Sequence, residues 1–228
     1  EFALYSGTKY AVAVNSGTSA LEAPSRYYIS GCSSRTRAVW MGGNEGSGYV
    51  DTIEFNTFST KGDAVAFGEL IGADRHFGAG FANQTRGIMA GGESPSKTNQ
   101  IEFITIAQTG NAVDFGDLLS DNKVYPAGCG NQTRGVFGNG GASGSKVNTM
   151  CFVTIASKGD AEDFGDTTQA RSNSSGLASP TRGIFAGGYT PTNVNTIDYI
   201  TIASTGDASE FGDMTFKSTM SGQGCSST

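Results

Sequence analysis

The feature that most constrains this chain is an internal repeat, in which a unit of about 48 residues recurs four times. Each copy begins at a Thr-Arg pair, and the pairs are almost evenly spaced along the chain. They are Thr36-Arg37, Thr85-Arg86, Thr133-Arg134 and Thr181-Arg182. A repeat that fills most of a 228-residue chain indicates one domain in which each unit packs on its neighbours.

Within each unit the hydrophobic pattern predicts short β-strands. An apolar run ending in glycine follows each Thr-Arg pair, as in 183–188, and predicts a strand buried on both faces. The next segment, as in 195–203, alternates apolar and polar side chains, which is typical of a strand with one face in the core. A Gly-Asp or Gly-Asn turn then leads to a third strand, and a Ser/Gly-rich fourth segment, such as 169–179, closes the unit.

Four short strands per unit predict an all-β protein, a small β-propeller of four-stranded blades. Glycine accounts for 34 of 228 residues, about twice its usual share of roughly 7%. Each glycine inside a helix costs roughly 0.5–1 kcal/mol, which disfavours helical alternatives. A β-solenoid is the structural rival, but its coils of roughly 20–30 residues are shorter than this unit.

The ends of the chain leave the number of blades open. The units are 36–84, 85–132, 133–180 and 181–228, and residues 1–35 form an N-terminal segment. Ala23 to Arg35 has the pattern of the fourth strand of a preceding blade, because GCSS at 31–34 recurs within 222–227, where the chain stops as a new unit would begin. KYAVAV at 9–14 alternates like a first strand. The chain therefore has either four blades with an N-terminal extension or five blades, the last completed by both ends.

Two features resemble known repeat families. The di-glycine after the first strand, with an aromatic residue late in the unit, resembles a kelch repeat, although phenylalanine fills the late position and Trp40 is the only tryptophan. Units such as TRGIFAGG…NTIDYITIASTGDASEFGD, across residues 32–228, resemble repeats of tail-fibre and other structural proteins of marine bacteriophages. That resemblance implies a virion-surface or host-recognition role, and hence a location on a virion or outside the cell.

Residues 2–23 are similar to the N-terminal segment of the sugar aminotransferases that use pyridoxal phosphate. In that family the NSGTSAL run opens a helix that holds the cofactor phosphate, and the resemblance would give that role to Gly17, Thr18 and Ser19. The Schiff-base lysine and the large α/β domain of such an enzyme do not follow, because the repeat begins at once. We therefore expect a structural role for this segment and no cofactor.

Charge and hydropathy argue against two classes of partner. The chain has 21 acidic and 15 basic residues, a net charge of −6 and a pI of about 4.8, so it lacks the basic surface of a nucleic-acid binder. No apolar stretch approaches the roughly 18 residues that span a bilayer. We therefore expect a soluble protein that neither binds nucleic acid nor inserts into a membrane.

The residues with reactive side chains point to architecture and not to catalysis. His76 is the only histidine, which excludes a multi-histidine metal site, and we expect it to be exposed on an outer strand. The acids recur once per unit, including turn aspartates that are expected to bond neighbouring amides. We predict no enzyme and no metal. The structural repeat positions are Arg37, Arg86, Arg134, Arg182, Asp117, Asp166 and Asp213.

The recurrent arginines have two interpretations. Each is expected to bond carbonyl groups or an acid between blades, with Asp117, Asp166 and Asp213 as candidate partners; a ring of positive charge that attracts acidic sugars is the alternative.

The cysteines are expected to be free thiols. Cys32, Cys129 and Cys225 occupy a repeat position that Phe81 and Leu177 fill in other units, so it is an apolar position within the core. Equivalent positions in different blades are too far apart for a disulfide, which needs Cα atoms roughly 4.4–6.8 Å apart. Cys151 replaces the acids Glu54, Glu102 and Asp198 of the other units, so we expect it at the surface.

Binding is expected where the units differ, in the loops between the first and second strands at 44–49, 93–97, 142–146 and 189–193. The candidate contact residues are Tyr49, Lys97, Lys146, Tyr189 and Asn193. The leading hypothesis is a non-catalytic, virion-associated binding module, part of a tail fibre or appendage, that joins other virion proteins and contacts a host-surface glycan or protein. The alternatives are a purely structural decoration or assembly protein of the virion and a cell-surface lectin or adhesin.

Overall fold

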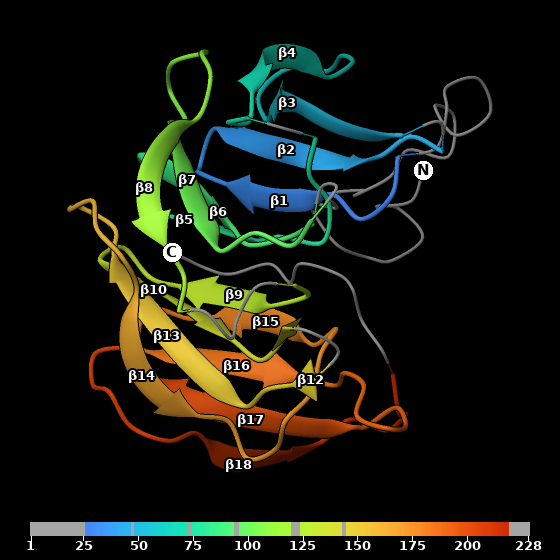
Figure 1. The fold of residues 1–228 in the computed structure, drawn as a ribbon. Helices are drawn as coiled ribbons and strands as arrows, with labels where there is room; N and C mark the ends of the chain where they lie inside the picture. Colours follow the sequence, from blue (N-terminus) through green and yellow to red (C-terminus); the bar gives the residue numbers. More distant parts are fainter. Residues whose placement is uncertain are drawn as a thin grey trace.

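The computed structural model describes residues 26–46, 48–72, 74–93, 96–119, 124–142 and 145–218. These residues form strands and no helix, so the prediction of an all-β chain is confirmed (Figure 1). No helix in the described ranges could therefore span a bilayer. Four antiparallel sheets of four strands each account for most of the fold, as expected for a small β-propeller.

Each sheet is called a blade and is numbered in chain order. Blade 1 contains β1 (Ser30–Ser33), β2 (Arg37–Asn44), β3 (Tyr49–Thr57) and β4 (Val65–Glu69). Blade 2 contains β5 (Ala79–Ala82), β6 (Arg86–Ala90), β7 (Gln100–Thr105) and β8 (Val113–Asp117). Blade 3 contains β9 (Ala127–Gly130), β10 (Arg134–Gly138), β13 (Thr149–Thr154) and β14 (Glu162–Asp166), and blade 4 contains β15 (Ser175–Ala178), β16 (Arg182–Ala186), β17 (Thr196–Thr201) and β18 (Ser209–Asp213). A small hairpin, β11 (Gly141–Ala142) and β12 (Ser145–Lys146), extends from blade 3.

The N-terminal strand of each sheet, which is β1, β5, β9 or β15, lies at the centre of the molecule. β1 packs on β5, β5 on β9, and β9 on β15, and together they line a narrow cavity of about 50 Å³. Glycine permits this approach: a Cβ atom on Gly80 would lie 2.8 Å from the carbonyl oxygen of Gly31. The described residues show no comparable packing of β15 on β1, so blades 4 and 1 do not meet as the other neighbours do.

Each sheet begins one segment earlier than the repeat unit read from the sequence. β15 lies in the segment 169–179 that was expected to close the third unit, yet it pairs with β16 of blade 4. Likewise, β1 was expected to belong to a preceding blade and pairs with β2. A repeat defines a period and not a starting point, because only the hydrogen bonds between strands decide which segments share a sheet.

The hydrophobic core consists of three clusters, each between two successive blades. The late aromatic residue of one blade is buried by the next, with exposed fractions of 4% for Phe67, 2% for Phe115 and 2% for Phe164. Burial of one such side chain stabilises the fold by roughly 1.5–3 kcal/mol. The blades are therefore held together mainly by apolar contact with their neighbours.

Backbone hydrogen bonds repeat at the same three interfaces. The turn glycine of one blade donates to the late phenylalanine carbonyl of the preceding blade at 2.7–2.8 Å: Gly110 to Phe67, Gly159 to Phe115 and Gly206 to Phe164. The aspartate after this glycine also bonds the preceding blade. Asp160 Oδ1 accepts from Asp117 N–H, and Asp207 Oδ1 accepts from Asp166 N–H, both at 3.0 Å. The expectation that these turn aspartates bond neighbouring amides was wrong, because the amides lie in the preceding blade.

The recurrent arginines bridge the blades through carbonyl groups. In blades 1 to 3 the Nη1 atom of this arginine donates at 2.6–3.1 Å to a carbonyl of the following blade, as Arg37 to Ile106, Arg86 to Ile155 and Arg134 to Ile202. The guanidinium groups of these three arginines also lie over a phenylalanine ring of their own blade, within 4.3–4.7 Å of the centroid. Within the described ranges no ion pair joins these arginines to Asp117, Asp166 or Asp213.

The three described cysteines, Cys32, Cys129 and Cys151, are free, as expected. Desolvation raises the pKa of each thiol to about 12. The surface position expected for Cys151 was wrong, because its side chain is 0% exposed within the core between blades 2 and 3. Cys225 lies outside the described residues.

Candidate binding face

The variable loops lie on one face of the propeller, together with the segments that enter the innermost strands. In each blade an isolated antiparallel bridge joins the two: Tyr27 to Asn44, His76 to Glu93, Val124 to Gly141 and Ser172 to Tyr189. We call this side the loop face. The bridges fix the loops to the rigid centre of the molecule, which makes this face a suitable scaffold for variable contacts.

On the loop face, three aromatic side chains lie next to one another around the axis of the propeller, one from each of blades 1 to 3. The ring centroids of Tyr28 and Phe77 are 4.1 Å apart, and those of Phe77 and Tyr125 are 4.3 Å apart. Their backbones are joined as well, since Phe77 N–H donates to Tyr28 O at 3.4 Å and Tyr125 N–H donates to Phe77 O at 3.3 Å. We call Tyr28, Phe77 and Tyr125 the aromatic arc.

The backbone of the arc is strained. Tyr28, Phe77 and Tyr125 have φ angles of +61°, +60° and +57°, and Asn173 has +58° at the equivalent position of blade 4. Asparagine tolerates this left-handed conformation, whereas a bulky aromatic residue rarely adopts it. Such strain costs roughly 1–3 kcal/mol per residue and is found mostly at functional sites.

Further aromatic rings extend the arc. Tyr49 stacks on His76 with centroids 3.9 Å apart and planes 9° apart, and Tyr27 meets Tyr28 edge to face at 5.6 Å. The exposed fractions are 43% for Tyr27, 42% for Tyr28 and 39% for Tyr49, so each ring presents a surface to solvent. The loop face therefore contains a continuous aromatic patch.

The exposed position expected for His76 was wrong. Its side chain is only 3% exposed, since Tyr49 covers its ring and Phe77 lies against it at 4.1 Å. Desolvation lowers the pKa of His76, and the hydrogen bond and charge of Glu93 oppose the shift. The imidazole is therefore neutral near pH 7, and its Nδ1 atom is buried without a hydrogen-bond partner among the described residues.

The candidate contact residues fall into two groups on this face. Tyr49 belongs to the aromatic patch, and the exposed Lys97 pairs through its backbone with Glu93, which bridges His76. In blades 3 and 4, the Lys146 ammonium lies 4.6 Å from the centroid of Tyr189, whose backbone pairs with Asn193. Among the described residues no hydrogen bond, ion pair or ring contact joins the two groups.

Sequence reasoning missed the arc itself. Tyr28, Phe77 and Tyr125 recur with the period of the repeat, so aligning the units would have placed them in one column. That column was not recognised because its fourth member is Asn173, which is not aromatic.

Buried ion pairs fix the linkers beneath the loop face. Arg75 lies 2.5 Å from Glu102 in blade 2, and Arg171 lies 2.7 Å from Asp198 in blade 4. Desolvation raises the pKa of Glu102, while Arg75 and the N–H of Ile71 oppose the shift. In blade 1 the linker is fixed by a more exposed ion pair, in which Arg26 lies 2.9 Å from Glu54.

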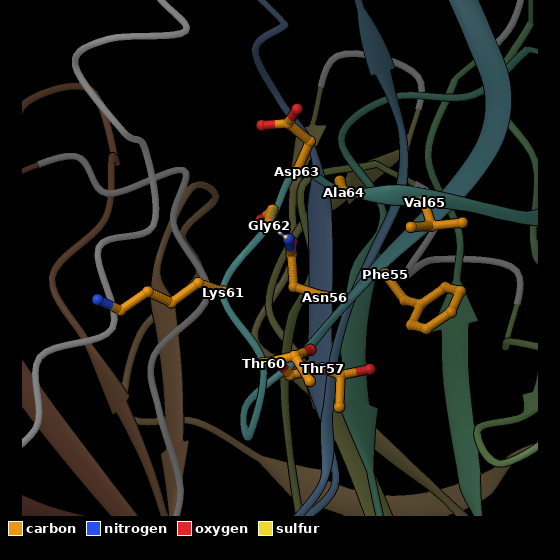
Figure 2. A pocket seen from close by; sticks show the side chains of 9 residues that line it. All are labelled: Phe55, Asn56, Thr57, Thr60, Lys61, Gly62, Asp63, Ala64 and Val65. Carbon is orange, nitrogen blue, oxygen red and sulfur yellow. Dashed lines mark hydrogen bonds between the residues drawn. The ribbon is translucent and has the colours of Figure 1, made fainter.

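The second cavity lies away from this face, at the turn that precedes β4. It has a volume of about 340 Å³ and is lined by residues of β3, the turn and β4. Figure 2 shows Lys61 and Asp63 pointing away from Phe55 and Val65 around it. No group of three His, Cys, Asp or Glu side chains in the described part of the chain could hold a metal ion. Gly17, Thr18 and Ser19, the phosphate positions implied by the aminotransferase resemblance, lie outside that part.

Comparison with protein-family models and with curated proteins found no match for this chain. The function therefore has to be inferred from the loop face.

Proposed function

We propose that this protein is a non-catalytic binding module, carried on a virion, whose loop face binds a glycan of a host surface. The observation that carries the proposal is the aromatic arc, in which three rings from successive blades share one strained backbone conformation. Exposed aromatic rings offer an apolar surface on which the C–H face of a sugar ring stacks, and a few polar groups around them set specificity.

Polar groups at the arc support a ligand rich in hydroxyl groups. The Oδ1 atom of Asn173, which occupies the blade 4 position of the arc, is buried without a hydrogen-bond partner in the described part of the chain, as is His76 Nδ1. A buried polar atom without a partner costs roughly 1–3 kcal/mol. A sugar hydroxyl would satisfy Asn173 Oδ1 or His76 Nδ1 only by displacing the side chains that bury them. The donors at the surface are therefore Lys97 and Lys146 of the surrounding loops.

The virion location is supported by the resemblance of residues 32–228 to repeats of phage structural proteins. A decoration or assembly protein of the virion is the second candidate, because the repeats that residues 32–228 resemble also occur in other structural proteins of the virion. Its position in a particle separates the two: a tail tip favours recognition, and an ordered capsid lattice favours a structural role.

The binding test compares the wild type with Tyr28→Asn on a glycan array and in competition with adsorption to host cells. Asparagine removes the ring but keeps the backbone, because Asn173 has the same φ at the equivalent position. We expect an affinity loss of about tenfold or more, which corresponds to about 1.4 kcal/mol. Tyr28→Phe should retain binding by stacking, and Val113→Ala, at an exposed site on β8, should leave it unchanged.

A wild-type protein that neither binds any glycan nor competes for adsorption would contradict the proposal. Equal affinities of the wild type and Tyr28→Asn would place the ligand elsewhere on the molecule.

A further inference from the structure

Cations of the chain lie over aromatic rings in every blade, but not over the aromatic patch. The recurrent arginine of each blade lies 4.3–5.2 Å from the centroid of a ring in its own blade. On the loop face, the Lys146 ammonium lies 4.6 Å from the centroid of Tyr189. Within the described ranges no cation covers a ring of the arc or Tyr49. These rings can therefore accept a cation from outside the chain.

The spacing of the rings suits a single cation. A cation is attracted to an aromatic face when it lies within about 6 Å of the ring centroid. The centroid of Phe77 lies 4.1 Å from that of Tyr28 and 4.3 Å from that of Tyr125, so one cation at the arc can be in range of two rings at once. Tyr49 has one face on His76 and is 39% exposed, so its other face is the one that meets solvent.

A carboxylate without a partner lies beside these rings. Glu93 is joined to His76 by two backbone hydrogen bonds of 3.0 and 3.3 Å. Its half-buried side chain has no ion pair or hydrogen bond with another described residue. The arginine of the same linker, Arg75, is already paired with Glu102. Glu93 therefore provides a negative charge that no described side chain neutralises.

The hydroxyl groups of the patch lie near this carboxylate. Desolvation raises the pKa of Tyr125, and the charges of Glu93, Tyr28 and Tyr49 raise it further. Charges in salt solution act on one another strongly only within roughly 10 Å, so these four groups lie together although they come from three blades. The raised pKa keeps the Tyr125 hydroxyl neutral near pH 7, where Glu93 supplies the negative charge.

Lys97 is the cation of the chain that lies nearest in the loop hairpin, because its backbone pairs with that of Glu93. Its side chain is exposed, and among the described residues it makes neither an ion pair with Glu93 nor a ring contact with the patch. An exposed lysine gains little from a nearby acid. Lys97 therefore does not occupy the place of the missing cation.

We propose that the aromatic patch binds an ammonium group of the host-surface ligand, with Glu93 as its counter-ion. The inference rests on the proposed function, because it names the part of the glycan that the loop face recognises. Aromatic faces together with a carboxylate favour an ammonium group over a neutral sugar, and Glu93 repels an acidic one. The amine of an amino sugar and a quaternary ammonium substituent such as choline share this chemistry.

The first test uses two matched pairs of probes on the wild-type chain. Choline is compared with 3,3-dimethylbutan-1-ol, which has the same shape without the charge. Glucosamine oligomers, at a pH at which their amines are protonated, are compared with N-acetylglucosamine oligomers. Calorimetric titration should show a preference of about tenfold or more for the charged member of at least one pair, and the pair that shows it identifies the source of the ammonium group.

Equal affinities within both pairs would overturn the inference. If the neutral oligomer then binds and Tyr28→Asn weakens its binding, the proposed function stands without the charge preference. A protein that binds no probe and no glycan of the array contradicts both proposals.

The second test removes the counter-ion. Glu93→Gln keeps the size of the side chain and should weaken binding of the preferred charged probe about fivefold or more, while binding of its neutral partner stays unchanged. Glu162→Gln, at an exposed acid of β14, is the matched control and should affect neither probe. Unchanged binding of the charged probe by Glu93→Gln would overturn the role of Glu93. An equal loss in Glu162→Gln would assign the attraction to the net charge of the chain and overturn the site.

Discussion

Blades 2 and 4 hold the linkers that enter them with a buried ion pair, whereas blade 3 has a thiol where those blades have the acid. Glu102 and Asp198 are 1% and 0% exposed, and each lies within 2.7 Å of an arginine. Cys151 is equally buried but packs among apolar side chains, with a pKa raised to about 12. In blades 2 to 4 the residue at this repeat position is therefore always buried, but it is not always charged.

The difference shows what a buried acid needs in this fold. Thr168 Oγ1 donates to Asp198 Oδ1 at 2.7 Å and Ile71 N–H donates to Glu102 Oε2 at 2.7 Å, so each carboxylate has a second donor besides its arginine. A buried charge is tolerated only when it is paired and hydrogen-bonded. Blade 3 avoids that requirement by using an uncharged side chain.

The largest effect is expected when one partner of the most buried pair is removed. Arg171→Met leaves Asp198 charged and unpaired in a site where both side chains are 0% exposed. We expect a loss of about 3–5 kcal/mol in the free energy of unfolding, measured by urea denaturation at pH 7. Arg182→Met removes an exposed arginine and should change stability by no more than about 0.5 kcal/mol. A loss below about 1 kcal/mol for Arg171→Met would show that the pair does not hold the linker.

Removing both charges of the blade 4 pair, with the thiol of blade 3 in place of the acid, should recover most of that loss. Arg171→Met combined with Asp198→Cys removes both charges and keeps an apolar group at each position, so no charge stays buried alone. Replacing a buried ion pair by apolar groups is often close to neutral, but Thr168 loses its acceptor, so we expect a net loss of about 1–2 kcal/mol. If the double variant is less stable than Arg171→Met, the comparison with blade 3 fails.

The pair in blade 1 should matter less, because water reaches it. The side chains of Arg26 and Glu54 are 12% and 38% exposed. Arg26→Met is expected to cost about 1 kcal/mol or less, since exposed pairs contribute little, and about 1 M NaCl should reduce the difference further. An effect as large as that of Arg171→Met would mean that burial does not set the ranking of the pairs.

The period, the strands and the all-β class could be predicted because alternating side chains and turn glycines are local signals. The phase of the repeat could not, since the pairing of β15 with β16 depends on hydrogen bonds between segments. The buried acids were missed because a charged residue normally lies at the surface, and a distant arginine overrides that rule for Glu102. The arc was missed because no local rule favours a left-handed Phe77.

The smallest effect concerns the residue that follows Arg75 in blade 2, which is His76; Val124 stands at the same repeat position in blade 3. Because desolvation lowers the pKa of His76, the unfolded chain binds a proton near the ordinary value of 6.5 that the folded protein does not bind. The wild type should therefore lose stability as the pH falls below 6.5.

His76→Val gives blade 2 the residue of blade 3 and should remove this dependence. We expect the wild type to lose more stability than the variant between pH 7.5 and 5.5, measured by parallel urea titrations. The variant also loses the ring under Tyr49, so its stability at pH 7.5 alone does not test the titration. Equal losses in both proteins would mean that the folded imidazole accepts a proton beneath Tyr49.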